Sequence, residues 1–215
     1  MKQTKVIGIT GTIGSGKSEV AKIIGNMGYP VLSSDAIAKE LMVKNKKLMS
    51  KLKKEFGERV YQNDGSLNKD YLASEVFGRD KKSKEKREKL NSITHPFVID
   101  ELIKKVETYT KEGEEMVFNE SALIFEAGLD DGYDYIINVD APKEVCLKRI
   151  TERSGISGEE VLQRMKSQFS AEEKKRLADF TIDNSGTLEK LEDSVKFTIE
   201  LIKDLPPKDF EAGIV

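Results

Sequence analysis

Eight residues near the start of the chain have the types and spacing needed to bind phosphate. They fit the pattern G-x-x-x-x-G-K-[ST], in which glycines let the backbone curl so that successive amide groups face one anion. Lys17 would neutralise the outer phosphates, and the Ser18 hydroxyl can coordinate Mg²⁺. The segment, called the phosphate loop below, predicts a bound nucleoside triphosphate. Its members are Gly11, Thr12, Ile13, Gly14, Ser15, Gly16, Lys17 and Ser18.

The sequence around the phosphate loop predicts the strand and the helix that must hold it. Residues 5–10 are typical of a short buried strand. Apolar residues then recur at helical spacing over 17–27, and Gly28 followed by Pro30 ends this helix. Residues 31–32 indicate a second strand. This order of elements favours a parallel α/β fold, in which the helix directs the positive end of its dipole at the phosphates.

The middle of the chain has a different character. From about residue 36 to 112 the sequence is charged and helical, which predicts a helical insertion. A second charged helical stretch, about 151–176, is expected to form a lid, and Ser157 with Glu160 predicts a helix capping box inside it. The remaining predicted elements are strands at 116–118, 135–139 and 180–182 and an amphipathic helix at 187–203.

Composition narrows the class of protein. The formal net charge of −2 and the pI of about 5.7 do not fit a basic nucleic-acid binder. The single cysteine, Cys146, cannot form an intrachain disulfide, which fits a reducing cytoplasm, and its apolar surroundings predict a core residue. Residues 1–5 are polar, so neither a signal peptide nor a membrane span is expected. We expect the chain of 215 residues to act as a cytoplasmic monomer and to have no nucleic-acid or membrane partner.

A phosphate loop alone does not name a reaction, because GTPases, motor ATPases and small-molecule kinases all use one. The guanine-reading Asn-Lys-x-Asp is absent, and the only Asp-x-x-Gly, at 183–186, comes too late for a GTPase switch. A compact kinase is favoured, in which ATP donates its γ-phosphate to a small acceptor bound by the insertion under a lid. A nucleoside monophosphate or another metabolite as acceptor, or a non-catalytic nucleotide-binding module, stays open on these grounds.

Further motifs, in order along the chain, make the interpretation specific. The segment Ser33–Glu40 reads Ser-Ser-Asp-Ala-Ile-Ala-Lys-Glu. Together with the phosphate loop it resembles dephospho-coenzyme A kinases, which have an Asp-Ala-Asp-x-Ile-Ala-Arg-type segment after the second strand. The resemblance extends from Val6 to about Ile202. Its other motifs are Leu90–Val98, Ala122–Glu126, Cys146–Arg149 with Arg153, Gln168, Lys175–Asp179 and Ile182–Gly186.

Five positions depart from the family pattern. The phosphate loop and the second aspartate, Asp35, are both kept. The departures therefore concern how the acceptor is held more than the reaction itself. They are Ser33 and Ser34 in place of the first two residues of Asp-Ala-Asp, Lys39 for an arginine, Glu120 for an aspartate and Ala122 for a proline.

The resemblance implies the last step of coenzyme A synthesis, in which ATP phosphorylates the ribose 3′-hydroxyl of dephospho-coenzyme A. It also implies a five-stranded parallel sheet with a helical acceptor domain and a lid. Phosphoryl transfer depends on positioning and charge neutralisation, which Lys17 and Mg²⁺ would supply. Asp35, just past a strand end, would orient the acceptor hydroxyl and take its proton. Lys39 and His95 would belong to the acceptor site.

Structural interpretations compete at several of these residues. Asp35 opens a predicted helix and can act as its N-cap. His95, the only histidine, stands beside the helix breaker Pro96 and can be a satisfied core residue. Arg149 and Arg153 are four residues apart and hence on one helix face. They either close over the phosphates of ATP or form surface ion pairs with glutamates of the lid.

Overall fold

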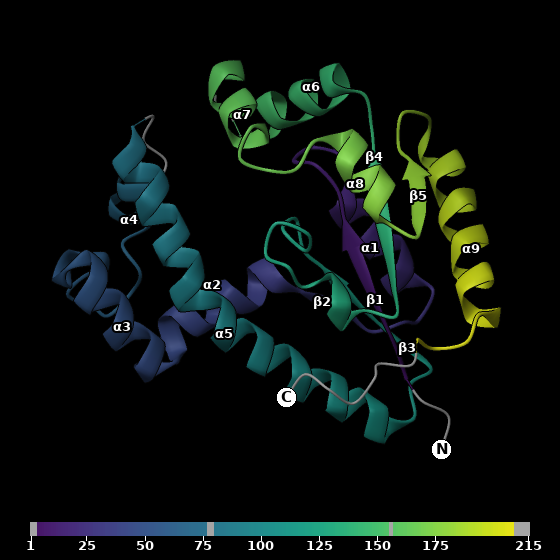
Figure 1. Cartoon of the computed structure of the whole chain (residues 1–215), viewed down its shortest axis with the longest axis horizontal. Helices are drawn as coiled ribbons and strands as arrows, with labels where there is room; N and C mark the ends of the chain where they lie inside the picture. Colours follow the sequence, from purple (N-terminus) through teal and green to yellow (C-terminus); the bar gives the residue numbers. More distant parts are fainter. Residues whose placement is uncertain (1–3, 77–79, 155–156, 209–215) are drawn as a thin grey trace. The chain divides into compact units, whose positions relative to one another are not determined.

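A five-stranded parallel sheet organises the part of the chain that carries the phosphate loop (Figure 1). Its order is β2-β3-β1-β4-β5, so β1 (Lys5–Thr10) lies at the centre between β3 (Met116–Glu120) and β4 (Tyr135–Asp140). The edges are β2 (Val31–Ser33) and β5 (Phe180–Asp183). All pairings are parallel. The predicted strands and the α/β fold with a parallel five-stranded sheet are confirmed.

The computed structural model describes residues 4–76, 80–154 and 157–208, and they divide into two compact units. The sheet unit comprises the described parts of 1–33 and 106–215. The helical unit comprises residues 34–105, where the sequence predicts an insertion over about 36–112. Among the described residues, none of the helices is both long and apolar enough to cross a membrane.

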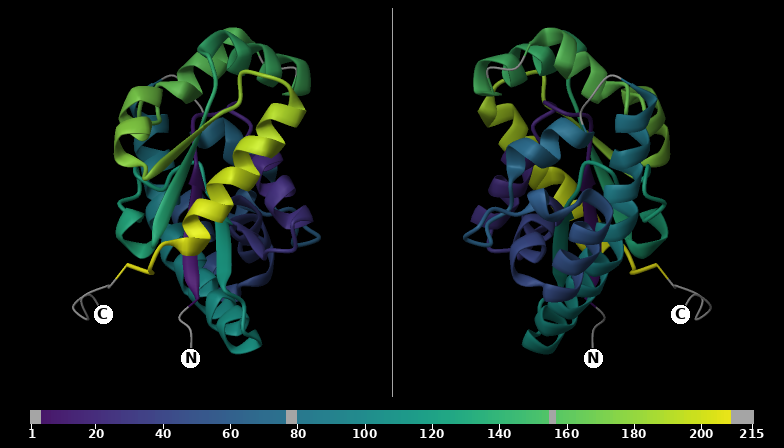
Figure 2. Two further views of the ribbon diagram at one scale, coloured as in Figure 1. Left: turned by 90° about the vertical axis from the view of Figure 1, so that its right-hand side faces the viewer. Right: turned by 90° about the vertical axis from the view of Figure 1, so that its left-hand side faces the viewer.

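Apolar side chains on one face of the sheet pack against α1 (Lys17–Asn26) and α9 (Leu188–Asp204). Ile7 and Ile9 of the central strand are fully buried there. Figure 2 shows α9 running diagonally across the strands. The other face is covered by the segment after β3, which includes the short helix η2 (Asp130–Gly132). Both faces are buried, as the continuous apolar strands require.

Lys5, at the start of β1, is joined to the end of α9. Its ammonium group donates to the carbonyl oxygens of Ile202 at 2.8 Å, Lys203 at 2.8 Å and Leu205 at 2.6 Å. The residue is only 6% exposed. The last carbonyls of a helix have no partner within the helix and carry partial negative charge, so a cation here satisfies and stabilises them.

The helical unit has a core of its own. It contains α2 (Ser34–Lys44), α3 (Lys46–Phe56), η1 (Glu58–Val60), α4 (Lys69–Val76) and most of α5 (Lys81–Glu112). The Tyr61 hydroxyl donates to the Met42 carbonyl at 2.6 Å and joins this core to α2. The core side chains are Leu48, Leu52, Phe56, Val60, Tyr61, Leu72 and Val76.

Two local expectations in the helical unit are wrong. Pro96 does not break the helix, because α5 runs without interruption from Lys81 to Glu112. Proline removes one backbone donor, a penalty of about 3 kcal/mol. Thr94 and Val98 are buried on either side of Pro96, and other side chains of α5 pack against the helical core, which offsets this penalty. Asp35 is not the residue before a helix, since α2 begins at Ser34 and Asp35 lies in its first turn.

The stretch expected to form the lid contains the end of α6 (Lys143–Ser154), α7 (Gly158–Met165) and α8 (Ala171–Leu177). Gly155 and Ile156, part of the interruption noted in the sequence, lie outside the described residues. The predicted capping box at the start of α7 is confirmed, with Ser157 and Glu160 as partners. A second capping box, formed by Ser170 and Glu173, begins α8.

Candidate nucleotide-binding site

The phosphate loop connects the end of the central strand to the first turn of α1. Its three glycines adopt positive φ angles, 149° at Gly11, 86° at Gly14 and 99° at Gly16. Each also lies against another segment, because an added Cβ would come within 2.3 Å of the Val139 carbonyl oxygen, 2.7 Å of the Cys146 carbonyl oxygen and 2.0 Å of the Asn184 amide nitrogen, respectively. Glycine is therefore required by backbone conformation and by space.

The Lys17 side chain folds back onto the first residues of the phosphate loop, of which it is a member. Its ammonium group donates to the carbonyl oxygens of Gly11 at 3.0 Å and Thr12 at 3.1 Å. The same Thr12 carbonyl accepts from the Ser15 amide at 3.2 Å, which closes a tight turn. The cation is thus held within the curl of the loop, where it can exchange carbonyl partners for phosphate oxygens.

A carboxylate stands next to the Ser18 hydroxyl. Ser18 donates to Oε1 of Glu120 at 2.7 Å, and Glu120 ends β3, the strand beside β1. Mg²⁺ prefers oxygen ligands and commonly takes one or two from the protein, the others being phosphates and water. In the described part of the chain no group of three or more His, Cys, Asp and Glu residues can hold a metal. The Ser18–Glu120 pair fits a magnesium ion that is shared with phosphates.

Two side chains, Asn184 just after β5 and Arg149 on α6, contact the Ser15 carbonyl of the phosphate loop. The Asn184 amide donates to the Ser15 carbonyl at 2.8 Å. Arg149, on α6, donates to the same carbonyl at 3.4 Å and to the Asn184 carbonyl at 3.0 Å. Arg149 therefore contacts backbone carbonyls at the loop. Arg153 lies one turn further along α6 and is exposed.

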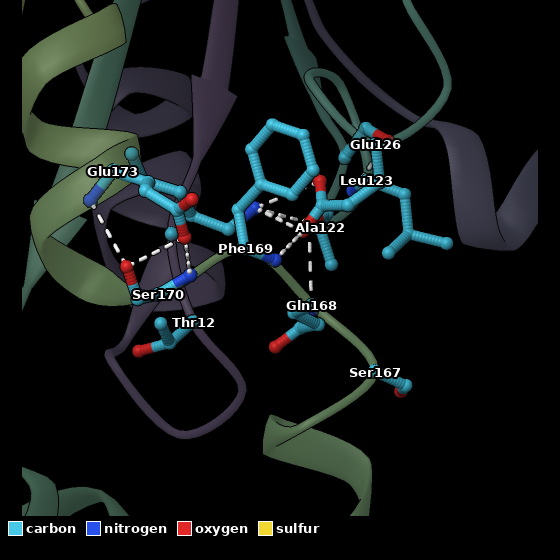
Figure 3. Close-up of polar contacts among 12 residues, drawn as sticks. Thr12, Ala122, Leu123, Glu126, Ser167, Gln168, Phe169, Ser170 and Glu173 are labelled. Carbon is cyan, nitrogen blue, oxygen red and sulfur yellow. Dashed lines mark hydrogen bonds and ion pairs between the residues drawn. The ribbon is translucent and has the colours of Figure 1, made fainter.

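A third contact reaches the loop from the connection between α7 and α8. The Ile13 amide donates to Oε1 of Gln168 at 2.9 Å. Figure 3 shows Gln168 near the loop that carries Thr12 and bonded to Ala122 on the segment after β3. The loop is thus held by residues more than 100 positions away in the sequence.

Cys146 confirms the expectation of a core residue. The side chain is 1% exposed, and its thiol donates weakly to the Ala141 carbonyl at 3.5 Å. Burial raises the pKa of the Cys146 thiol, which keeps it protonated and unreactive. Its contribution to the site is the backbone carbonyl packed against Gly14.

The residues expected to hold the acceptor belong to the helical unit. Asp35 and Lys39 are exposed and lie four residues apart on α2, so they share one face of that helix. His95 is half-buried within α5, and burial lowers the pKa of its imidazole, which favours the neutral form. The donor residues gather around the phosphate loop, whereas these three side chains are distributed over two helices.

Comparison with known proteins decides the family. A family model described as dephospho-CoA kinase matches residues 5–190. A dephospho-CoA kinase of Listeria monocytogenes serotype 4b is 39% identical over 191 residues, which cover 89% of this chain and 94% of that relative. This chain belongs to the dephospho-CoA kinase family. The resemblance found in its motifs is therefore confirmed, and the chain is an enzyme of the P-loop kinase class.

Solved structures agree with membership of the dephospho-CoA kinase family. A crystal structure of a Thermus thermophilus protein is similar with a TM-score of 0.76 at 36% identity, covering 94% of this chain and 99% of that one. A dephospho-CoA kinase from Campylobacter jejuni gives a TM-score of 0.68 at 27% identity, over 94% and 98% of the two chains.

Within the dephospho-CoA kinase pattern, three residues at the site had no role assigned from the sequence. Glu120 stood out only as a departure from the family pattern, although an acid at the end of a strand beside β1 is a signal for a metal ligand. Asn184 and Gln168 belong to motifs of the resemblance, but nothing in their local sequence shows that they contact the phosphate loop. The contacts of these three residues with the phosphate loop depend on the folded arrangement of segments that are far apart in the sequence.

Proposed function

We propose that the protein transfers the γ-phosphate of Mg-ATP to the ribose 3′-hydroxyl of dephospho-coenzyme A, giving coenzyme A and ADP. The observation that carries the proposal is the intact phosphate loop, with Lys17 inside its curl and the Ser18–Glu120 oxygen pair beside it. Membership of the dephospho-CoA kinase family supports the choice of acceptor. The proposal includes action as a cytoplasmic monomer, which fractionation and size-exclusion chromatography would test.

Lys17 is assigned to the β- and γ-phosphates. The carbonyl oxygens of Gly11 and Thr12 that accept from the ammonium are neutral, whereas triphosphate oxygens would accept charge-assisted hydrogen bonds. The first turn of α1 adds backbone amides and the positive end of the helix dipole. Together these groups stabilise charge that develops as the phosphoryl group leaves ADP.

Ser18 and Glu120 are assigned to hold Mg²⁺. When bound, the ion would neutralise part of the negative charge on the phosphates. Glu120 also accepts a hydrogen bond from Ser18, and this contact sets the hydroxyl oxygen toward the strand end. Substitution of Glu120 by Gln should raise the Mg²⁺ concentration needed for half-maximal activity, whereas the affinity for metal-free ATP should hardly change.

Arg149 and Arg153 are assigned to the nucleotide. Arg149 already contacts the back of the loop through the Ser15 carbonyl, so it supports the loop as well as adding positive charge. Arg153 is exposed on the next turn of the same helix and can extend toward the triphosphate. Both positive charges would stabilise the negative charge on the phosphoryl oxygens in the transition state.

Asp35 is assigned to orient the acceptor hydroxyl and to take its proton. It follows β2 by two residues, and ligands of open α/β sheets bind beyond the carboxyl ends of strands. Its exposure leaves the carboxylate accessible to a substrate. Lys39 and His95 are assigned to acceptor binding, Lys39 through charge and His95 as a neutral hydrogen-bonding imidazole.

A coupled ADP-release assay with Mg-ATP and dephospho-coenzyme A tests the reaction. Turnover should depend on the acceptor, and mass spectrometry should find one phosphate added at the 3′-oxygen. Adenosine monophosphate and adenosine serve as competing acceptors in the same assay. Turnover with one of these but none with dephospho-coenzyme A would reject the proposal in favour of another small-acceptor kinase. ATP binding without any turnover would favour a non-catalytic nucleotide-binding module.

Asp35→Asn tests the assignment of the base. The variant should bind ATP as the wild type does but lose turnover by roughly 10²–10⁴-fold, the usual contribution of a positioned general base. Glu40→Gln, which neutralises another exposed acid on α2, is the matched control and should keep activity. Near-normal turnover in Asp35→Asn would remove this residue from the role.

A further inference from the structure

The tip of the phosphate loop is a tight turn, and the amide of its second residue has an acceptor outside the turn. The Ser15 amide bonds back to the Thr12 carbonyl at 3.2 Å, and Gly14, the third residue of the turn, has a φ of 86°. These features are those of a type II turn, in which the second residue, here Ile13, has no acceptor for its amide within the turn. Oε1 of Gln168 accepts from that amide at 2.9 Å.

The other end of the Gln168 side chain is bound to a different segment. Its Nε2 donates to the carbonyl oxygen of Ala122 at 3.4 Å (Figure 3). The same carbonyl accepts from the ammonium of Lys174 at 2.9 Å. One amide group therefore connects the phosphate loop to the segment that follows β3.

The backbone on both sides of Gln168 is fixed, so the side chain is presented in a defined direction. The Gln168 amide donates to the Met165 carbonyl at 3.1 Å. The next amide, of Phe169, donates to Glu126 at 2.8 Å, and Ser170 then caps α8. Gln168 itself is half-buried. Because the backbone beside Gln168 is fixed, its side chain loses less conformational freedom when it binds the phosphate loop.

The anchor for these contacts is a buried ion pair. Lys174, on α8, is fully buried and lies 2.9 Å from the carboxylate of Glu126, whose side chain is 12% exposed. A lysine is buried only when its charge is paired, so the pair holds α8 and the segment after β3 together. Gln168 is thus linked to both members of this pair: to Lys174 through the shared Ala122 carbonyl, and to Glu126 through the amide of the next residue, Phe169.

We propose that Gln168 is a positioning residue for the phosphate loop. By holding the Ile13 amide, it fixes the turn and thereby the direction of the backbone amides from Gly14 to Ser18 that face the triphosphate. The inference rests on the proposed nucleotide site and is independent of which acceptor the enzyme uses.

The test compares Gln168→Met, which keeps the length of the side chain without its polar atoms, with Gln168→Ala. Both variants should lose affinity for ATP, measured by calorimetry without acceptor, by the same factor of roughly 3–10, the value of one net hydrogen bond. Inorganic tripolyphosphate should weaken by that factor too, because the loop contacts phosphates and not the base. The KM for dephospho-coenzyme A and the melting temperature should stay near wild-type values.

Ser167→Ala is the matched control, since within the described residues the exposed Ser167 hydroxyl donates only to the Arg164 carbonyl one turn back. It should bind both ligands normally. Full affinity in Gln168→Met with a loss only in Gln168→Ala would overturn the proposal, because packing and not the hydrogen bond would then position the loop. Unchanged affinity in both variants would overturn it as well. If wild-type protein binds ATP but does not phosphorylate dephospho-coenzyme A, the proposed acceptor fails while these binding measurements still decide the role of Gln168.

Discussion

The sheet unit and the helical unit are built for their tasks in different ways. In the sheet unit, Asn184, Arg149 and Gln168 come from three separate segments and hydrogen-bond to backbone groups of the phosphate loop. In the helical unit the expected acceptor residues are two exposed charges on α2 and one half-buried histidine, around an independent apolar core. We therefore expect the first arrangement to tolerate few substitutions and the second to tolerate changes of surface charge without loss of fold.

Two lysines, one in each unit, give the largest expected contrast. Lys17→Ala should lower kcat by about 10³-fold with any acceptor, because it removes a charge that stabilises the transferring phosphoryl group. Lys39→Ala should instead raise the KM for dephospho-coenzyme A and leave the KM for ATP unchanged. Steady-state kinetics with each substrate varied in turn measures both. A shift in the KM for ATP on Lys39→Ala would contradict the division of labour.

Ion pairs give the next contrast. Lys174→Met should lower the free energy of unfolding by about 3 kcal/mol, since it breaks a buried pair and leaves Glu126 without its cation. Lys44→Met in the helical unit breaks a pair whose side chains are 71% and 54% exposed and should change stability by less than about 0.5 kcal/mol. Urea unfolding of both variants provides the comparison. Equal losses would mean that burial does not distinguish the two pairs.

A pair of glycine substitutions separates backbone strain from close packing. Gly16→Ala should weaken ATP binding by about 100-fold, which corresponds to about 2.7 kcal/mol, because the new Cβ would displace Asn184 from the loop. Gly65→Ala has a similar φ of 82° but nothing within 4 Å of the new Cβ. It should lower the free energy of unfolding by about 1–2 kcal/mol without changing ATP affinity. An equal loss of affinity in the two variants would contradict the packing argument.

The smallest expected effect concerns pH. Burial lowers the pKa of His95 in the folded protein, so in mildly acidic solution the unfolded chain takes up a proton that the folded chain does not. Stability should therefore fall as the pH drops from the ordinary histidine pKa of about 6.5 toward the lowered value. His95→Gln should flatten this part of the stability curve, which urea unfolding between pH 5 and 7 would measure. Because the chain has one histidine, a change in this part of the stability curve can be assigned to His95.

The sequence was most informative where structure is local. The strand, loop and helix of residues 5–27 follow from spacing within a few positions, and so does the capping box at Ser157. The contacts that complete the site join residues 102 (Ser18 to Glu120), 155 (Ile13 to Gln168) and 169 (Ser15 to Asn184) positions apart. Local periodicity contains no information about such pairs, although family motifs pointed to some of the residues.

The error at Pro96 has a related cause. The intrinsic preference of proline against helix interiors is local, but α5 is held by side chains that pack on either side of it. Tertiary packing overrode a propensity of about 3 kcal/mol. The assignment of Asp35, Lys39 and His95 to the acceptor stays a prediction, because it depends on the resemblance and not on contacts within the helical unit.

The contact of Lys5 with the end of α9 affects the order in which the protein can be completed during synthesis. Lys5 lies in the first strand, but its carbonyl partners are 197, 198 and 200 residues later. At about 5–20 residues per second, a ribosome needs roughly 10–40 seconds to make the intervening chain. During that time the central strand contains a cation with its helix partners still missing. The sheet is therefore expected to reach full stability only after the last helix has left the ribosome.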